Sequence, residues 1–488
     1  MEQADFFRRN LGSKEIAERV AEKAENSVPA YGKFLEKYKF GRGSPFEARP
    51  IMDKASYISA HPFSELLPKN HEDIFTIFKS SGSSGHSFFW PQLKQSHRHS
   101  ANLLRTFLET AFFVDQGKTL AIVGLALGSW IGGDYFSWIL KSMAVETPYS
   151  FAVFSPGNHH EEIIEIIIKA EIFVDQIILF VCPSAISRLH LRADQRGFPL
   201  PKAKMKYVVI GEPFPESLRF SILENSRCSE NSSVMLSVFG SADTGVLGFE
   251  SSATVAIRQL LSRNSKLLSD LQLPVPVPHF FHSCAPNAYL ESENGELCVT
   301  LWQGIPIVRY NLHDSCRLYN WKEFRNSILA FDGFNPEDEP FKACLWASKE
   351  SLPDIIAIQG RSDSCLILCG TNITEGMLDE AVKCSELESV LTGVYKAQIC
   401  YENERQFLEL HLEFSPHNKI DSALLDRVYS LLIQALGRVQ PEFLDDWRNV
   451  YKFWDDDPSK QIIRIKPFSW PALSQTLGAK IKQRGISR

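Results

Sequence analysis

The sequence lacks an uncharged apolar run long enough to cross a membrane, which takes about 20 residues. The stretch from Thr119 to Leu140 comes closest, but Asp134 and four glycines interrupt it. That pattern is typical of a buried strand, loop and helix. The N-terminal residues, which include Arg8 and Arg9, also lack the apolar core of a signal peptide. We therefore expect a cytoplasmic protein without a membrane span.

An excess of positive charge is also lacking. The chain has 52 lysines and arginines against 58 aspartates and glutamates, which gives a formal net charge of −6. Proteins that bind nucleic acid usually carry a basic footprint, so the composition argues against nucleic acid as a main partner. A negatively charged nucleotide would need a local site built from backbone amides and a metal ion.

Two further absences concern cysteine spacing and the P-loop. None of the ten cysteines forms a CxxC pair. We therefore favour reduced, buried thiols over a zinc site. The weaker zinc alternatives are Cys365, Cys369 and Cys384, or His279, His282 and Cys284. No Gly-x-x-x-x-Gly-Lys-Ser/Thr sequence occurs, which argues against a P-loop NTPase or kinase.

A chain of 488 residues is too long for one ordinary core, so two or three domains are expected. Helical patterns lie at 12–40, 95–114 and 161–169, and strand patterns lie at 74–78, 119–123, 176–181, 205–210, 297–302 and 305–310. Strands that alternate with helices predict an α/β fold with parallel sheets.

The pattern of expected helices and strands changes after Arg361. The order there is strand, strand, helix, strand, strand, helix, which predicts a separate small α+β domain. We expect the boundary near Asp363. The expected organisation is a large, multi-subdomain domain at 1–362, which includes the N-terminal helical segment, and a small C-terminal domain at 363–488.

The segment Ser80-Ser81-Gly82-Ser83-Ser84-Gly85 follows one of the strand patterns. Glycine lets the backbone approach a phosphate closely, while amide N–H groups and hydroxyls donate to its oxygens. Ser81, Ser83 and Ser84 are the candidate donors, and Gly82 and Gly85 permit the turn. A flexible linker or a tag sequence is the alternative, but both apolar flanks argue against it.

Four more segments carry candidate site residues downstream. They are Gly211-Glu212-Pro213, Phe239-Gly240-Ser241-Ala242-Asp243-Thr244-Gly245, and the pair Arg309-Tyr310-Asn311-Leu312-His313-Asp314 and Gly360-Arg361-Ser362-Asp363. A carboxylate suits two ribose hydroxyls because it accepts both protons, and magnesium prefers carboxylate and phosphate oxygens. Each segment alone is also typical of an ordinary turn. Their fixed order favours a nucleotide site.

In this order the segments resemble the acyl-adenylate-forming superfamily, in the branch of phenylacetate–CoA ligases and the acyl-protein synthetases of bacterial luminescence. The resemblance extends roughly from residue 30 to the C-terminus. It implies that the Gly/Ser loop holds the phosphates of ATP and that Gly211, Glu212 and Pro213 line adenine, with Phe239 stacking nearby. It further implies that Asp243, in the segment from Phe239 to Thr244, ligates magnesium. Asp314 is implied to hold the ribose, and Arg361 is implied to contact the nucleotide.

The resemblance also implies a mobile C-terminal domain that rotates about Asp363. The tail carries Lys480 and Lys482, which match the family's lysine-containing ending. A cation is needed where a carboxylate attacks a phosphate, because both reactants are anions. Lys482 is the first candidate for the catalytic lysine and Lys480 the second. A solvated basic tail is the alternative.

The segment from Ala126 to Gly133 resembles the part of the family that shapes the acid pocket. The candidate pocket residues in it are Gly128, Trp130, Gly132 and Gly133. We expect Trp130, Tyr135 and Trp138 to make that pocket bulky and apolar. An aromatic run of this density is equally typical of a buried core.

The resemblance therefore implies an enzyme that uses ATP and magnesium to convert a small carboxylic acid, aryl or fatty, to acyl-AMP. The acyl group then passes to a thiol, with coenzyme A favoured and an acyl-carrier protein or an amine as alternatives. No cysteine follows Cys400, which argues against transfer to the chain's own C-terminal cysteine. The oligomeric state stays open, and a homodimer is one option because dimers are common among soluble enzymes.

Four positions depart from the family pattern. His86 follows the Gly/Ser loop where the family has lysine, Ala242 replaces a hydroxyl residue, Asp243 replaces glutamate and His313 replaces glycine. The alternative interpretation is a degenerate homologue that binds a nucleotide or acyl compound without turnover.

Overall fold

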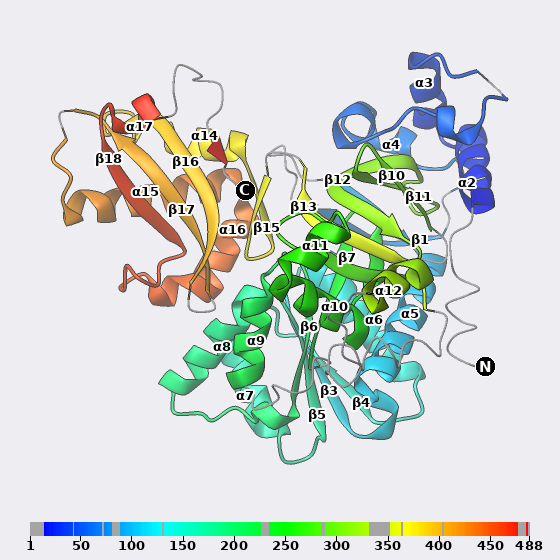
Figure 1. Cartoon of the computed structure of the whole chain (residues 1–488), viewed down its shortest axis with the longest axis horizontal. Coiled ribbons are helices and arrows are strands. Elements are labelled where there is room, and N and C mark those ends of the chain that lie inside the picture. Colours follow the sequence, from blue (N-terminus) through cyan, green and yellow to red (C-terminus); the bar gives the residue numbers. More distant parts are fainter. Residues whose placement is uncertain are drawn as a thin grey trace.

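The computed structural model describes most of the chain. The described ranges are 14–41, 43–70, 73–80, 88–128, 131–225, 234–284, 288–330, 352–362, 365–402, 405–416, 418–476 and 485–486. Two parts can be distinguished in Figure 1. A large part surrounds an 11-stranded sheet, and a smaller C-terminal part, yellow to red, surrounds a four-stranded sheet. The large α/β part and the small α+β part agree with the predicted fold class.

The large sheet is mixed, with the order β10-β11-β12-β13-β9-β8-β7-β6-β5-β3-β4. Its strands are β3 (Thr119–Gly124), β4 (Phe151–Phe154), β5 (Gln176–Val181), β6 (Met205–Val209), β7 (Met235–Ser241), β8 (Gly245–Phe249), β9 (His279–Ser283), β10 (Ala288–Glu293), β11 (Glu296–Leu301), β12 (Ile307–Tyr319) and β13 (Ile355–Arg361). The strands from β4 to β7 pair in parallel, as predicted. The remaining pairs are antiparallel. Where a short turn joins two strands, as between β7 and β8, it allows no parallel crossover.

Helices cover both faces of the parallel strands. Those on one face are α5 (Lys94–Phe112) and α6 (Ile131–Glu146), and those on the other are α7 (His160–Ala170), α8 (Pro183–Gln195) and α9 (Glu216–Asn225). Ala121 and Val123 of β3 pack on the first face, whereas Leu120 and Ile122 pack on the second. This alternation explains why every residue of β3 is buried, as a strand covered on both faces requires.

The N-terminal helical pattern forms two helices, α2 (Lys14–Ser27) and α3 (Pro29–Lys37), rather than one. Pro29 lacks a backbone N–H and disfavours helical geometry at Val28, so the first helix ends there. Both helices pack with β10 to β12 in one apolar cluster. Three short helices follow, η1 (Phe46–Ala48), the π-helix η2 (Lys54–Ile58) and α4 (Phe63–Leu66), before the hairpin of β1 (Ile74–Ser80) and β2 (Phe88–Leu93).

A further layer of helices covers β9 and β13. It consists of α10 (Ser252–Arg263), α11 (Ser265–Asp270) and α12 (Trp321–Leu329). None of the helices in the described ranges is both long and apolar enough to span a membrane.

The C-terminal part has its own apolar core, which contains described residues between Leu366 and Ile463. Its elements are β14 (Cys365–Leu368), β15 (Thr371–Thr374), α14 (Glu375–Val382), β16 (Leu391–Glu402), β17 (Arg405–Phe414), α15 (Ser422–Val439), α16 (Pro441–Asp446), β18 (Ile463–Ser469), α17 (Ala472–Thr476) and β19 (Gly485–Ile486). The order from β14 to α15 is the predicted one. Asp363, the predicted boundary, lies outside the described residues, so the exact division stays a prediction.

Candidate functional site

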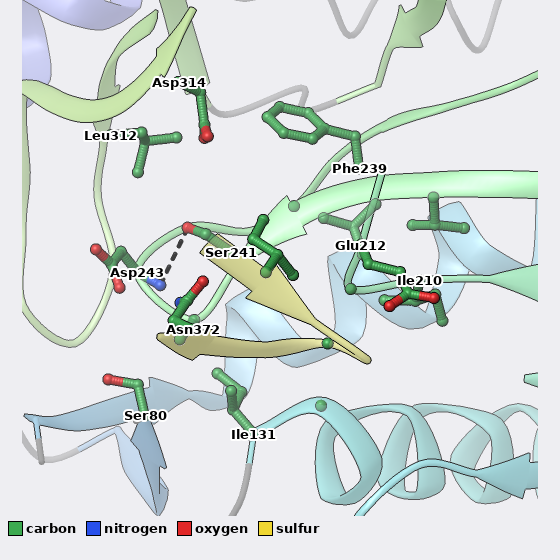
Figure 2. A pocket seen from close by; sticks show the side chains of 18 of the residues that line it. Ser80, Ile131, Ile210, Glu212, Phe239, Ser241, Asp243, Leu312, Asp314 and Asn372 are labelled. Atoms are coloured by element: carbon green, nitrogen blue, oxygen red, sulfur yellow. Dashed lines mark hydrogen bonds between the residues drawn. The ribbon is translucent and has the colours of Figure 1, made fainter. Parts of the chain in front are cut away.

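A cavity of about 300 Å³ lies where the two parts of the chain meet. Its walls come from the ends of β6, β7, β12 and β13, the first turns of α6, and the β14–β15 hairpin. Figure 2 shows Glu212, Asp243 and Asp314 around this cavity. The predicted residues that line it are Gly211, Glu212, Pro213, Phe239, Gly240, Ser241, Asp243, Gly132, Asp314 and Arg361. The fold therefore brings all four downstream motif segments into one site.

The turn between β7 and β8 presents Asp243 to the cavity. A Cβ on Gly240 would lie 2.3 Å from the carbonyl oxygen of Gly245, so this turn requires a glycine there. Inside the turn, the Asp243 N–H donates to the Ser241 hydroxyl at 3.2 Å. The Thr244 hydroxyl lies 3.0 Å from that of Ser241 and is buried beside the cavity rather than in its lining. Thr244 thus supports the turn.

The Asp243 carboxylate is buried and has two partners of different kinds. Tyr310 donates its hydroxyl hydrogen to Oδ2 at 2.7 Å, and Nζ of Lys54 lies 3.1 Å from Oδ1. Gln303 donates to the backbone carbonyl of Asp243. Lys54 lines the cavity from the start of η2, which Asp53 caps. The sequence analysis missed Lys54, because an isolated lysine in a turn-rich segment carries no pattern.

Asp314 and Arg361 face each other across the antiparallel pair β12 and β13. Their side chains are 3.9 Å apart, measured from Nη1 of Arg361 to Oδ1 of Asp314. The preceding residue, His313, has a φ of 58°, in the left-handed region that glycine adopts most readily. The backbone at His313 therefore has a conformation that suits glycine, which is the residue that the family pattern has at this position. The His313 ring lies 3.4 Å from Asp53, whose pKa it lowers.

Glu212 lies at the contact between the two parts of the chain. Its Oε1 accepts a 2.6 Å hydrogen bond from the Ser184 N–H in the first turn of α8. Its Oε2 is buried without a hydrogen-bond partner among the described residues. Burial raises the pKa of Glu212 to about 7. Gly370 and Asn372, from the C-terminal part, line the cavity beside it.

Several direct contacts hold the C-terminal part against this region. The Tyr401 hydroxyl donates to the carbonyl of Pro213 at 2.6 Å, and the Asn158 amide donates to Oδ1 of Asp446 at 2.7 Å. Burial raises the pKa of Asp446 to about 7 as well. Two carboxyl groups with raised pKa values therefore lie near the same interface.

The segment expected to shape the acid pocket lies only partly along the cavity. Gly132 and Tyr135 line the cavity, whereas Gly128 and Gly133 do not. A Cβ on Gly133 would lie 2.2 Å from the carbonyl of Ala126, so Gly133 serves a close backbone contact. The expectation for Trp138 is wrong, because its ring is 48% exposed and packs edge-on against Phe75 and His97. Tyr135 lines the cavity, whereas Trp138, one helical turn further along α6, does not.

Some predicted residues lie outside the described ranges. These are Ser81, Gly82, Ser83, Ser84, Gly85, Trp130, Asp363, Lys480 and Lys482. The strand that leads into the Gly/Ser loop is described, and its last two residues, Lys79 and Ser80, line the cavity. Figure 2 shows Ser80 at the edge of the site. The start of the predicted phosphate loop is thus next to the cavity.

No group of three potential ligands suited to a metal ion occurs in the ranges that the structure describes. His279 and His282 have other partners. Nε2 of His279 lies within hydrogen-bond distance of both the N–H and the carbonyl oxygen of Phe214. Nε2 of His282 lies 3.0 Å from the hydroxyl of Ser251. Burial lowers the pKa of each histidine to about 4.

No protein-family model and no curated protein sequence matches the chain. Among solved structures, 2-hydroxyisobutyryl-CoA ligase in complex with 2-HIB-AMP and CoA, in the thioesterification state, is similar with a TM-score of 0.55 and 15% identity. The match covers 95% of this chain and 88% of the ligase. The same ligase with R3-HIB-AMP, in the postadenylation state, gives a TM-score of 0.50 and 14% identity with the same coverage. The chain therefore shares the fold of this acyl-CoA ligase, which agrees with the fold expected from its sequence.

Proposed function

We propose that this protein activates a carboxylic acid with ATP, forming an acyl-AMP and pyrophosphate, and then transfers the acyl group to a thiol. The observation that supports this proposal is the convergence of four separate motif segments, and of the strand leading into the Gly/Ser loop, on one cavity. A cavity of about 300 Å³ lies at the lower end of the usual range for small-molecule sites.

Each part of the nucleotide has candidate partners in this cavity. Gly211 to Pro213 and the Phe239 ring would line adenine, an aromatic surface that stacks well on another ring. Asp314 would accept hydrogen bonds from the ribose hydroxyls, and Arg361 would contact the nucleotide beside it. Ser80 and the following loop, 81–85, would lie along the phosphates.

Asp243 fits a role as a magnesium ligand. Its Oδ1 is buried, accepts no hydrogen bond from a described residue, and has the Lys54 ammonium as a charged neighbour. A single protein carboxylate with phosphate oxygens and water is a typical magnesium environment. Bound magnesium would supply positive charge to the triphosphate. Asp243 would position that charge beside the reacting phosphate.

In the proposed first step, a carboxylate oxygen of the acid attacks the α-phosphorus of ATP, and the bond to the bridging oxygen breaks as pyrophosphate leaves. Lys482, or alternatively Lys480, would stabilise the negative charge that develops there. In the second step a thiolate sulfur attacks the acyl carbonyl carbon and AMP leaves. A rotation of the C-terminal part about Asp363 would separate the two steps.

Coenzyme A is the acceptor that we favour. The structurally similar ligase was crystallised with CoA and 2-HIB-AMP, which supports a thiol as the second substrate. An acyl-carrier protein or an amine would require the same acyl-AMP, so the first step is common to all three acceptors.

A second candidate function is nucleotide binding without turnover. The ion pair between Lys54 and Asp243 favours it, because this lysine neutralises the carboxylate that magnesium would need. The two candidates differ in one chemical property. Only a catalyst can exchange pyrophosphate with ATP in the presence of an acid.

The test is acid-dependent ATP–pyrophosphate exchange with magnesium, across a panel of short, aryl and fatty acids. We expect radioactive pyrophosphate to enter ATP with at least one acid and not without acid. Binding of ATP in a calorimeter without exchange for any acid would refute catalysis and support the second candidate. An Asp314→Asn variant provides the site control, and it should lose most of the preference for ATP over 2′,3′-dideoxy-ATP.

A further inference from the structure

Five ionisable side chains form a buried cluster beside the part of the cavity that adenine would occupy. They are Glu216, Arg219, Glu250, Arg258 and His279, and none of these side chains is more than 9% exposed. Arg219 lies between the two glutamates, 3.0 Å from Oε2 of Glu216 and 2.9 Å from Oε1 of Glu250. Arg258 is the second partner of Glu216. Two guanidinium groups therefore balance two carboxyl groups.

The charges in this cluster are settled at neutral pH. Burial alone would raise the pKa of Glu250, but the Arg219 guanidinium outweighs it and holds that pKa at about 2. Burial and the charge of Arg258 lower the pKa of His279 to about 4, so its ring is neutral. Pairing within a buried cluster offsets the cost of removing charges from water with little net gain in stability. The contacts of the cluster with the cavity wall are therefore a separate feature from its stability.

The polar contacts of His279 are with the turn that would line adenine. Its Nε2 lies 3.3 Å from the backbone nitrogen and 3.0 Å from the carbonyl oxygen of Phe214, the residue after Pro213. In either neutral tautomer Nε2 makes one hydrogen bond, because it accepts from the N–H or donates to the carbonyl. The other ring nitrogen, Nδ1, lies 3.7 Å from Oε1 of Glu250. Arg258 also donates to the Phe214 carbonyl, at 2.7 Å. Two side chains of the cluster thus hold the backbone of this turn.

The His279 ring also belongs to a stack that reaches the cavity wall. It is nearly parallel to the Phe281 ring, with an angle of 10° between the planes and 6.0 Å between the centroids. Phe281 stacks in turn on Phe239, with centroids 5.3 Å apart. Phe239 is the ring that would lie near adenine, and Figure 2 shows it on the same side of the cavity as Glu212. All three stacked rings line the cavity. His279 is therefore linked to both structures that would hold the base.

We propose that His279 is a positioning residue for the adenine base, whose Nε2 holds the backbone of Phe214 and thereby the turn at 211–213 in its binding conformation. This inference rests on the proposed adenylation function, and the residue that it adds lies outside all of the motif segments. A turn that is already held in its binding conformation loses less entropy when the ligand binds, so the affinity is higher.

His282, on the same strand, is a matched control for His279. Both side chains are 7% exposed, and burial lowers the pKa of each to about 4. The ring nitrogens of His282, however, lie 3.0 Å from the Ser251 hydroxyl and 3.0 Å from the Pro353 carbonyl. His282 is not among the described residues that line the cavity. A substitution there should disturb packing to a similar extent without displacing the adenine turn.

The test compares two ligands by calorimetry, magnesium–ATP and magnesium–tripolyphosphate, which has the phosphates but no base. His279→Phe keeps a ring for the stack, and His279→Asn keeps a polar atom near Glu250, but neither can bond to Phe214. Each should bind ATP about tenfold more weakly and tripolyphosphate with less than about a twofold change. His279→Gln retains a polar atom that reaches Phe214, so it should bind ATP within about threefold of the unmodified protein. His282→Phe should bind both ligands normally.

ATP–pyrophosphate exchange supplies a second readout. In His279→Phe and His279→Asn we expect the KM for ATP to rise about tenfold and kcat to change less than about twofold, because the reacting groups are unaltered once the nucleotide is bound. A fall in kcat with an unchanged KM would contradict a positioning role in nucleotide binding.

Other outcomes would overturn the inference in distinguishable ways. Unchanged ATP affinity in His279→Asn would refute it while leaving the adenylation function intact. Equal weakening of tripolyphosphate and ATP would mean a general loss of site structure. Loss of ATP affinity in His279→Gln but not in His279→Phe would assign the effect to the ring stack. Melting temperatures would show whether each variant is folded, and His279→Asn decides if His279→Phe is not. Absence of ATP binding and exchange in the unmodified protein would refute both the adenylation function and this inference.

Discussion

The hydroxyl of Tyr310 donates a 2.7 Å hydrogen bond to Oδ2 of Asp243, across 67 positions of sequence. Both side chains are almost completely buried. This bond joins the segment from Arg309 to Asp314 to the turn between β7 and β8. The two segments, each of which alone is typical of an ordinary turn, therefore form one wall of the cavity.

Removal of the Tyr310 hydroxyl should lower the stability of the folded protein. In Tyr310→Phe, a buried carboxylate oxygen would lose its donor, which typically costs about 1–3 kcal/mol. We expect a fall of a few degrees in the apparent melting temperature, measured by differential scanning fluorimetry. Tyr38→Phe is the matched control, because the Tyr38 side chain is 47% exposed. An unchanged melting temperature in Tyr310→Phe would contradict the importance of the bond.

Lys54 should contribute to the binding of the triphosphate. Its ammonium lies in the cavity, 3.1 Å from the Asp243 carboxylate, and the Gly/Ser loop has no lysine of its own. In Lys54→Met we expect about tenfold weaker binding of magnesium–ATP in a calorimeter, equivalent to about 1.4 kcal/mol. Lys141→Met, an exposed lysine on α6, should bind ATP normally. Equal affinity in both variants would show that Lys54 only neutralises Asp243.

The C-terminal lysines should separate the two proposed half-reactions. Lys482→Ala is expected to reduce acyl-AMP formation at least a hundredfold, because a cation at the attacked phosphate stabilises the transition state. The same variant should still form thioester from supplied acyl-AMP. If Lys480→Ala shows this behaviour and Lys482→Ala does not, the catalytic lysine is Lys480. Exchange and thioester formation would both be measured by chromatography.

The stability of the fold should depend on pH through Glu212. Its pKa rises from 4.5 to about 7 on burial, so the folded protein binds a proton more tightly than the unfolded chain. This contribution is fully present below pH 4.5 and is lost as the pH rises toward 7. Above pH 7, Glu212→Gln should therefore be more stable than the unmodified protein, by about 3 kcal/mol at most. Near pH 4.5 the difference should almost vanish.

Thermal unfolding at several pH values would measure this effect. Glutamine keeps an oxygen that can accept the hydrogen bond from the Ser184 N–H, so the variant isolates the charge. Glu388→Gln, at an exposed position, serves as the control and should show no such pH dependence. A constant stability difference between Glu212→Gln and the unmodified protein at all pH values would refute the raised pKa.

Local patterns were sufficient to predict much of the fold. The strands β3, β5 and β6 are buried along nearly their whole length, so their continuous apolar runs are visible without any tertiary information. The sequence alone did not predict that the large sheet is mixed. Strand direction depends on which strands pair, and β13 pairs with β9 across more than 70 positions of sequence.

The order of the motif segments and the residue types in them can be read from the sequence, because glycine turns and carboxylates retain their chemistry in any fold. The tertiary structure brings a subset of these side chains into one cavity. It added Lys54 to the site and turned Trp138 away from it. The physical reason is that burial, pairing and pKa depend on neighbours that are distant in sequence, and no local pattern contains them.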